Sequence, residues 1–137
     1  MKKYSLIVIL HVLLPLIIGG SIYFFFRNHT WLNYYIFQKD QFLMKPPIGF
    51  PSKLFLYVFP DFCWSYSFTS ATLIWGKFYQ IRLKLLPLLI LCTLIICEAA
   101  QVMFKSYFTF DWFDMIVAIL AFILSMANIK YWSYEKK

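Results

Sequence analysis

The chain alternates between long apolar stretches and shorter polar segments. A helix needs about 20 mainly apolar residues to cross the roughly 30 Å hydrocarbon core of a bilayer. Four stretches meet this requirement, at about residues 5–26, 54–76, 83–104 and 110–132. We therefore predict an all-α integral membrane protein, with one transmembrane domain over residues 1–137 and four transmembrane helices in an antiparallel bundle.

Two of these stretches allow a second interpretation. The first could be a signal peptide, because small residues stand near its end at Gly19, Gly20 and Ser21. Its apolar run continues to Phe26, however, and exceeds the usual signal-peptide core of about 7–15 residues, so we predict an uncleaved span. The second contains Pro60, which fits the first turn of a helix and disrupts a helix interior. That helix is expected either to begin at Pro60 or to kink there.

The segment 27–53 is the only sizeable part of the chain outside the predicted spans. It is rich in aromatic residues and prolines. Aromatic side chains combine a large apolar surface with a polar edge and favour the membrane interface. We expect this extracytoplasmic loop to lie on the membrane surface or to cap the bundle.

The composition agrees with a lipid environment. Apolar residues make up 62% of the chain and charged residues 14%, whereas soluble domains carry about 25% charged residues. A soluble domain of this length cannot bury so much apolar surface, which excludes a soluble enzyme, a disordered tail and a small disulfide-bonded domain. Cys63, Cys92 and Cys97 lie in apolar stretches without metal-ligand spacing and are expected to be small buried hydrophobic residues.

Basic residues outnumber acidic ones by 13 to 6, and the net charge is +7. The bases are spread over loops and helix ends, so we expect them to orient the helices rather than to bind nucleic acid. An even number of spans places both termini on one side. With that side cytoplasmic, the inner flanks hold the larger set of bases: Lys2, Lys3, Lys77, Arg82, Lys84, Lys130, Lys136 and Lys137. Both termini are therefore predicted to be cytoplasmic.

Four acidic residues fall within the predicted spans or at their ends: Asp61, Glu98, Asp111 and Asp114. Asp61 lies near the outer start of the second span. Glu98 lies about 22 Å along the third span at 1.5 Å per residue, and the two remaining aspartates lie in the first turn of the fourth. We expect all four in the outer third of the bilayer, where they form a candidate acidic site.

Helical spacing supports this convergence. Glu98, Gln101 and Lys105 share one face of the third span. The second and fourth spans carry stripes of small and polar residues, which allow close helix packing in membranes. The stripes are Asp61, Ser65, Thr69, Thr72 and Gly76, and Asp111, Asp114, Ala118, Ala121, Ser125 and Asn128. We predict that these faces turn inward.

Carboxylates gathered in this way cannot all stay ionised without a counter-charge. They can act as a general acid or base, hold a divalent cation that bridges to a phosphate headgroup, or carry protons or cations in a transporter. Gln101 and Lys105 are candidate substrate-binding residues beside them, with Lys105 suited to a lipid-linked phosphate.

Each acidic residue also has a structural interpretation. Asp111 and Asp114 suit the positive end of a helix dipole, and Asp61 can mark a helix start. Glu98 is harder to explain in this way, because an ionisable group within a span costs about 2.5 kcal/mol or more. His11 lies early in the first span, away from these acids, and is expected to hydrogen-bond to a neighbouring helix rather than to act as a base.

Two motifs together resemble the signature of VanZ-like membrane proteins, in which an E-x-x-Q pair ends one helix and an F-D-x-x-D pair opens the next. In this chain they are Glu98-x-x-Gln101 and Phe110-Asp111-Trp112-x-Asp114. Pro60-Asp61 resembles the family's earlier Pro-Asp element, and the resemblance covers about residues 59–125. The chain departs from the family pattern at Lys105 and Thr109, a region in which members often carry arginine.

The resemblance implies a small protein of the bacterial cytoplasmic (inner) membrane that acts in the cell envelope, in a family named for teicoplanin resistance. We expect the acidic pocket to bind or act on an envelope lipid or lipid-linked precursor, with a divalent cation as a candidate cofactor. The alternatives are a proton- or cation-coupled transporter or channel subunit, and an accessory subunit of a membrane complex. Whether the protein is an enzyme, and whether it forms oligomers, stays open.

Overall fold

A computed structural model describes residues 2–26, 49–79, 86–103 and 112–134, and within these ranges every regular element is helical. The elements are α1 (Lys2–Val8), the π-helical turn η1 (Ile9–Leu13), α2 (Leu14–Phe26), α4 (Phe50–Phe78), α5 (Leu86–Met103) and α6 (Trp112–Tyr134). Because α1, η1 and α2 follow one another without a break, each of the four apolar stretches is represented by one helical segment. The predicted all-α class is confirmed.

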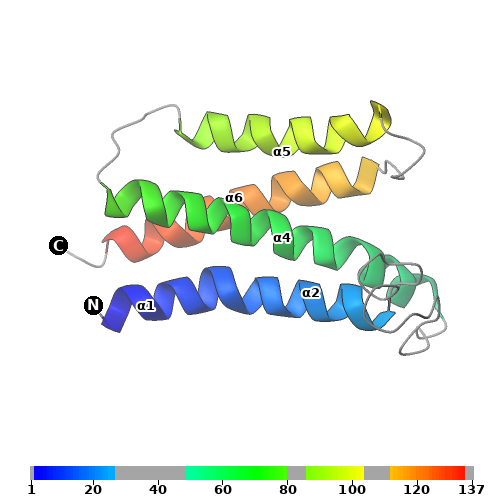
Figure 1. The fold of residues 1–137 in the computed structure, drawn as a ribbon, viewed down its shortest axis with the longest axis horizontal. Helices are drawn as coiled ribbons and strands as arrows, with labels where there is room; N and C mark the ends of the chain where they lie inside the picture. Colours follow the sequence, from blue (N-terminus) through cyan, green and yellow to red (C-terminus); the bar gives the residue numbers. More distant parts are fainter. Residues whose placement is uncertain (1, 27–48, 80–85, 104–111, 135–137) are drawn as a thin grey trace.

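The four helical segments alternate in direction along the long axis of the molecule (Figure 1). At one end of the bundle, which we call the terminal end, α1 and α5 begin and α4 and α6 end. At the opposite, distal end, α2 and α5 end and α4 and α6 begin. The first helix therefore begins, and the last helix ends, at the same end of the bundle.

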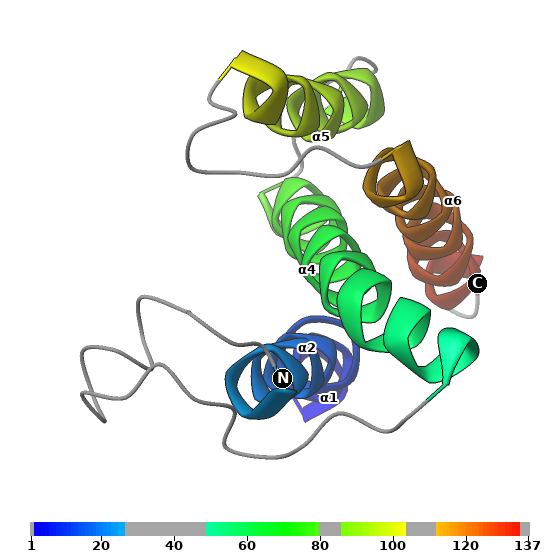
Figure 2. The same ribbon diagram turned by 90° about the vertical axis from the view of Figure 1, so that its right-hand side faces the viewer.

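Helix α4 is the centre of the arrangement (Figure 2). It packs extensively against α6 on one side and against the α1–η1–α2 segment on the other, whereas α5 makes smaller contacts with α6 and α4. The first segment, α4 and α6 thus form a three-helix core, and α5 lies against one side of it.

The interior of this core is built from small and hydroxyl-bearing side chains. Buried polar residues include Ser65, Ser67, Thr69 and Ser70 of α4 and Ser125 of α6. The hydroxyls of Ser70 and Ser125 lie 2.8 Å apart and link the two helices. A bond of this kind contributes about 0.6 kcal/mol on average where two helices meet inside a membrane, and the small side chains beside it let α4 and α6 pack closely.

Large apolar side chains cover the outside of the same helices. On α4, Trp64 is 51% exposed and Phe68 is 44% exposed, although their neighbours Ser65 and Ser67 are buried. By length and composition, the Ser5–Phe26 and Trp112–Ile129 segments are sufficiently long and apolar to cross a membrane. Small polar groups therefore fill the interior, and large apolar groups form the outer surface.

Helices α2 and α4 pack closely at Gly19. A Cβ atom added to Gly19 would stand 2.7 Å from the Cβ atom of Cys63 and 3.3 Å from the carbonyl oxygen of Pro60. Pro60 lies inside α4, which begins ten residues earlier at Phe50. The expectation that the helix begins at Pro60 is therefore wrong. The proline lacks the N–H that would bond to Leu56, and the glycine allows α2 to pack against this part of α4.

Candidate functional site

The predicted acidic residues lie on three different helices. Asp61 is in the distal half of α4, Glu98 is five residues before the end of α5, and Asp114 is in the first turn of α6. Because α4 and α6 begin at the distal end and α5 ends there, all three positions fall in the distal half of the bundle (Figure 1). Asp111 lies outside the described residues, so its place in the acidic site stays a prediction.

Two of these acidic side chains are described, and both are half-buried: Asp61 and Asp114. Gln101 lies in the last turn of α5, and Lys105 falls outside the described residues. Among the side chains that the structure describes, no group of three or more His, Cys, Asp or Glu residues is placed to hold a metal ion. The described part of the acidic site therefore consists of two partly shielded carboxylates on adjacent core helices.

The middle parts of the predicted inward faces of α4 and α6 lie inside the bundle, whereas Asn128 at the end of the α6 stripe is exposed. Thr69 and Ser125 have no exposed surface, and Ala118 and Ala121 are buried with them. Thr69 donates a hydrogen bond from Oγ1 to the carbonyl oxygen of Ser65, at 2.8 Å. This bond satisfies the hydroxyl within its own helix, so a polar side chain can be buried there without an interhelical partner.

Three hydrogen-bonded polar side chains, separate from the acidic residues, link all three core helices. Tyr66 of α4 is 8% exposed, and its hydroxyl oxygen lies 2.6 Å from Nδ1 of His11 in η1. Asn128 of α6 donates from Nδ2 to the same oxygen, at 3.0 Å. The expectation that His11 bonds to a neighbouring helix is confirmed, and Tyr66 is the residue that the sequence analysis did not single out.

The Tyr66 hydroxyl takes part in both hydrogen bonds between these three side chains. The amide of Asn128 donates to the Tyr66 oxygen, so Tyr66 can give its own hydroxyl hydrogen to Nδ1 of a neutral imidazole. A neutral histidine can be placed in an apolar surrounding at far lower cost than a charged one. The arrangement can therefore bind the helices together or hold a proton-accepting nitrogen inside the bundle.

The π-helical turn places His11 in this position. Pro15 follows the turn by two residues, and a proline ring clashes with the carbonyl group four residues earlier, which here is that of His11. The wider π turn relieves this clash and alters the register of the helix. Ser67 donates to the carbonyl oxygen of Val12 at 3.0 Å, so α4 satisfies a backbone acceptor within the irregular turn. The pairing of Pro15 with His11 was the sequence signal for this feature.

Replacing Tyr66 with phenylalanine should lower the free energy of unfolding by about 1–2 kcal/mol, because two interhelical hydrogen bonds are lost in an apolar interior. Chemical unfolding of the detergent-solubilised protein would measure the change. Tyr79→Phe is the matched control, since Tyr79 is exposed at the end of α4. Equal stability of the two variants would show that the Tyr66 hydroxyl does not connect the helices.

Comparisons with known proteins give no assignment: no family model, curated protein or solved structure matches the chain. The functional interpretation therefore rests on the residues and their geometry.

Proposed function

We propose that the chain is a four-span protein of the bacterial cytoplasmic membrane, of the VanZ-like type, with both termini in the cytoplasm. The inverted distribution of side chains supports this placement, because the outer faces of the helices carry exposed large apolar residues while hydroxyl groups lie inside. In water that surface would be an extended apolar patch, which soluble monomers rarely tolerate. The excess of bases on the flanks assigned to the cytoplasm supports the orientation.

The proposed activity is binding of an envelope lipid or lipid-linked precursor at the distal end, or chemistry on it. The observation that carries this proposal is that Asp61, Glu98 and Asp114 come from three helices and all fall in the distal half of the bundle. With the termini cytoplasmic, that end faces the outside of the cell, and in the sequence Lys105 comes two residues after the end of α5. A phosphate-bearing headgroup would meet carboxylates able to share a divalent cation with it, and a lysine of opposite charge.

The ionisable groups also define the chemistry that is available. A half-buried carboxylate such as Asp114 can take up or release a proton, provided that its substrate comes within hydrogen-bonding distance. Asp61 on the neighbouring helix can hold the cation or the substrate in place. Binding alone needs both groups as ligands, whereas catalysis needs one of them as a proton donor or acceptor.

A second candidate function is coupled transport of protons or cations. The observation that favours it is the buried Tyr66 hydroxyl between His11 and Asn128, with the Ser70–Ser125 pair as a further polar link inside the bundle. Polar groups within a membrane bundle often mark a path for protons or ions. In this case the acids would exchange ions with the outside, and the inner network would pass them on.

The test uses full-length protein in lipid nanodiscs and a polyprenyl diphosphate as the ligand. Glu98→Gln and Asp114→Asn should each weaken binding about tenfold or more, because a hydrogen bond or ion contact to a charged group is worth about 1.5–3 kcal/mol. Glu135→Gln is the matched control, since this carboxylate belongs to the C-terminal tail in the sequence.

The outcomes separate the candidates. Binding that is lost with Glu98→Gln and restored by neither Mg²⁺ nor Ca²⁺ supports a lipid site that uses this carboxylate. Wild-type binding by both site variants would contradict it. Proton or cation flux into proteoliposomes that disappears with Glu98→Gln would favour transport instead. If the variants fold and neither binding nor flux changes, the acidic residues serve only helix assembly, as in an accessory subunit of a larger complex.

A further inference from the structure

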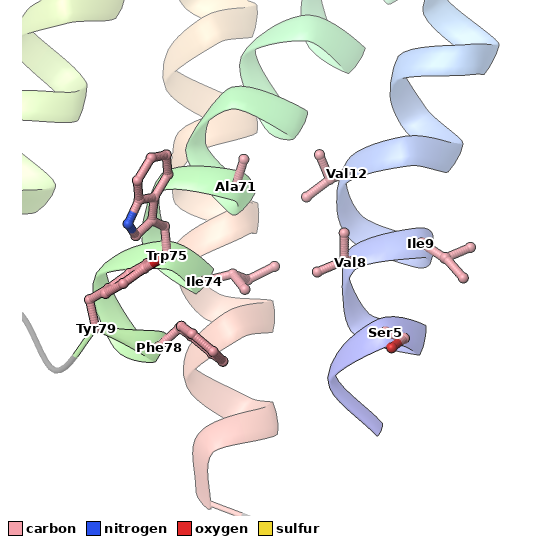
Figure 3. Close-up of a pocket in the computed structure, with 9 residues that line it drawn as sticks. All are labelled: Ser5, Val8, Ile9, Val12, Ala71, Ile74, Trp75, Phe78 and Tyr79. Carbon is pink, nitrogen blue, oxygen red and sulfur yellow. The ribbon is translucent and has the colours of Figure 1, made fainter. Parts of the chain in front are cut away.

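A groove runs between α1–η1 and the last turns of α4, at the terminal end of the bundle (Figure 3). Its volume is about 540 Å³, and it opens to the outside of the bundle. Val8 and Val12 face Ala71 and Ile74 across it (Figure 3). Trp75 lines it near the end of α4. The walls are apolar over most of their area, so the groove suits an apolar occupant.

Three lysines belong to the helix ends at this end of the molecule. Lys77 is exposed and lies in α4 between the groove residues Trp75 and Phe78. Lys2 and Lys3 form the first turn of α1, just before the groove residue Ser5. The acidic residues on the described helices all lie in the distal half. An apolar groove whose two helices both carry lysines at this end is complementary to a molecule with an apolar chain and an anionic head.

We propose that the groove binds one acyl chain of an anionic phospholipid of the cytoplasmic leaflet, with its phosphate at Lys77 and the lysines of α1. This inference rests on the membrane placement proposed above and is independent of the acidic site. Each lysine near an anionic lipid surface contributes about 1 kcal/mol of attraction. Trp75 and Tyr79 line the groove at the end of α4, and aromatic residues of this kind favour the level of the lipid headgroups.

The chemistry of the walls selects a lipid over a peptide segment. A peptide laid in the groove would turn backbone N–H and C=O groups toward valine, isoleucine and alanine side chains that offer no hydrogen-bond partners, and unpaired buried polar groups are costly. A hydrocarbon chain has no such groups. Its phosphate needs cations at one end of the groove only, and Lys77 lies at that end.

The experiment follows the fluorescence of Trp75 with brominated lipids. A variant in which the other tryptophans are phenylalanine is reconstituted in phosphatidylcholine bilayers that contain a small fraction of brominated phosphatidylglycerol or brominated phosphatidylcholine. Trp75 should be quenched several times more strongly by the anionic lipid. Lys77→Gln should reduce its apparent affinity about fivefold, the equivalent of about 1 kcal/mol.

A variant that keeps Trp64 alone is the matched control, because Trp64 is exposed on α4 and is not among the residues that line the groove. It should be quenched equally by both lipids. Equal quenching of Trp75 by both lipids would overturn the lipid site while leaving the membrane placement intact. If neither lipid quenches Trp75, the lipid site is overturned as well. A second copy of the chain or another protein covering the groove would give that result. If Trp64 is quenched by neither lipid, the membrane placement itself fails, and the lipid site fails with it.

Discussion

Arginine in place of Ile123 should sharply reduce membrane insertion of α6. Ile123 is at the midpoint of α6, and 54% of its surface is exposed. A charged residue at the centre of a membrane span costs about 2.5–3.5 kcal/mol on insertion scales. That cost corresponds to roughly a hundredfold shift in the equilibrium between inserted and non-inserted helix. Membrane fractionation, together with protease accessibility of the C-terminal tail, would measure it.

Phe113→Arg is the matched control for depth. Phe113 is 53% exposed, so the two positions differ little in burial, but it lies in the first turn of α6. An arginine near a helix end can extend its charged group to the membrane surface and costs little there. If α6 lay in water, both substitutions would change stability by no more than about 0.5 kcal/mol. Indistinguishable variants would therefore contradict the membrane placement.

Gly19→Ala should destabilise the bundle by about 2–3 kcal/mol, at the upper part of the range for an overfilled core. The added Cβ atom would stand 2.7 Å from the Cβ atom of Cys63. Neither that atom nor the nearby carbonyl oxygen of Pro60 can rotate away, so the two helices must separate. The separation would also weaken the neighbouring bond from Ser67 to η1. Unfolding in a graded mixture of mild and denaturing detergent would measure the loss.

The neighbouring glycine provides the control. A Cβ atom added to Gly20 meets no atom within 4 Å, and alanine is favoured over glycine within a helix by roughly 0.5–1 kcal/mol. Gly20→Ala should therefore be neutral or slightly stabilising. In a Cys63→Gly background, the cost of Gly19→Ala should shrink, because the closest opposing atom is gone. Similar losses for the two alanine variants would indicate that helix flexibility, rather than this contact, limits stability.

The helices could be predicted from sequence because their signal is long and redundant. A run such as residues 5–26 contains so many apolar residues that no single position decides the assignment. The inner faces could also be predicted, since small and polar residues at Thr69, Ala121 and Ser125 recur at helical spacing, and the structure buries all three. These features depend on local periodicity, which the sequence displays directly.

The rest depends on contacts between distant parts of the chain. Tyr66 is adjacent to the predicted stripe residue Ser65 and belongs to the helix face that meets η1, a neighbour that periodicity does not identify. The local preferences of proline predict either a helix start or a kink at Pro60, whereas the structure has it inside a longer helix that packs against Gly19. For the acidic site, helical phase predicts which residues share a face but not the distances between carboxylates on separate helices.

Of the four helical segments, α5 is the one least engaged with the others, and it carries Glu98, whereas Asp61 and Asp114 belong to the core. The acidic residues are therefore carried by one loosely packed helix and by two tightly packed helices. A headgroup or cation that draws Glu98 toward the aspartates can shift α5 without breaking the contacts among the other helices, because the weakly coupled element moves at the lowest cost. Occupancy of the proposed site would then displace one helix relative to the other three.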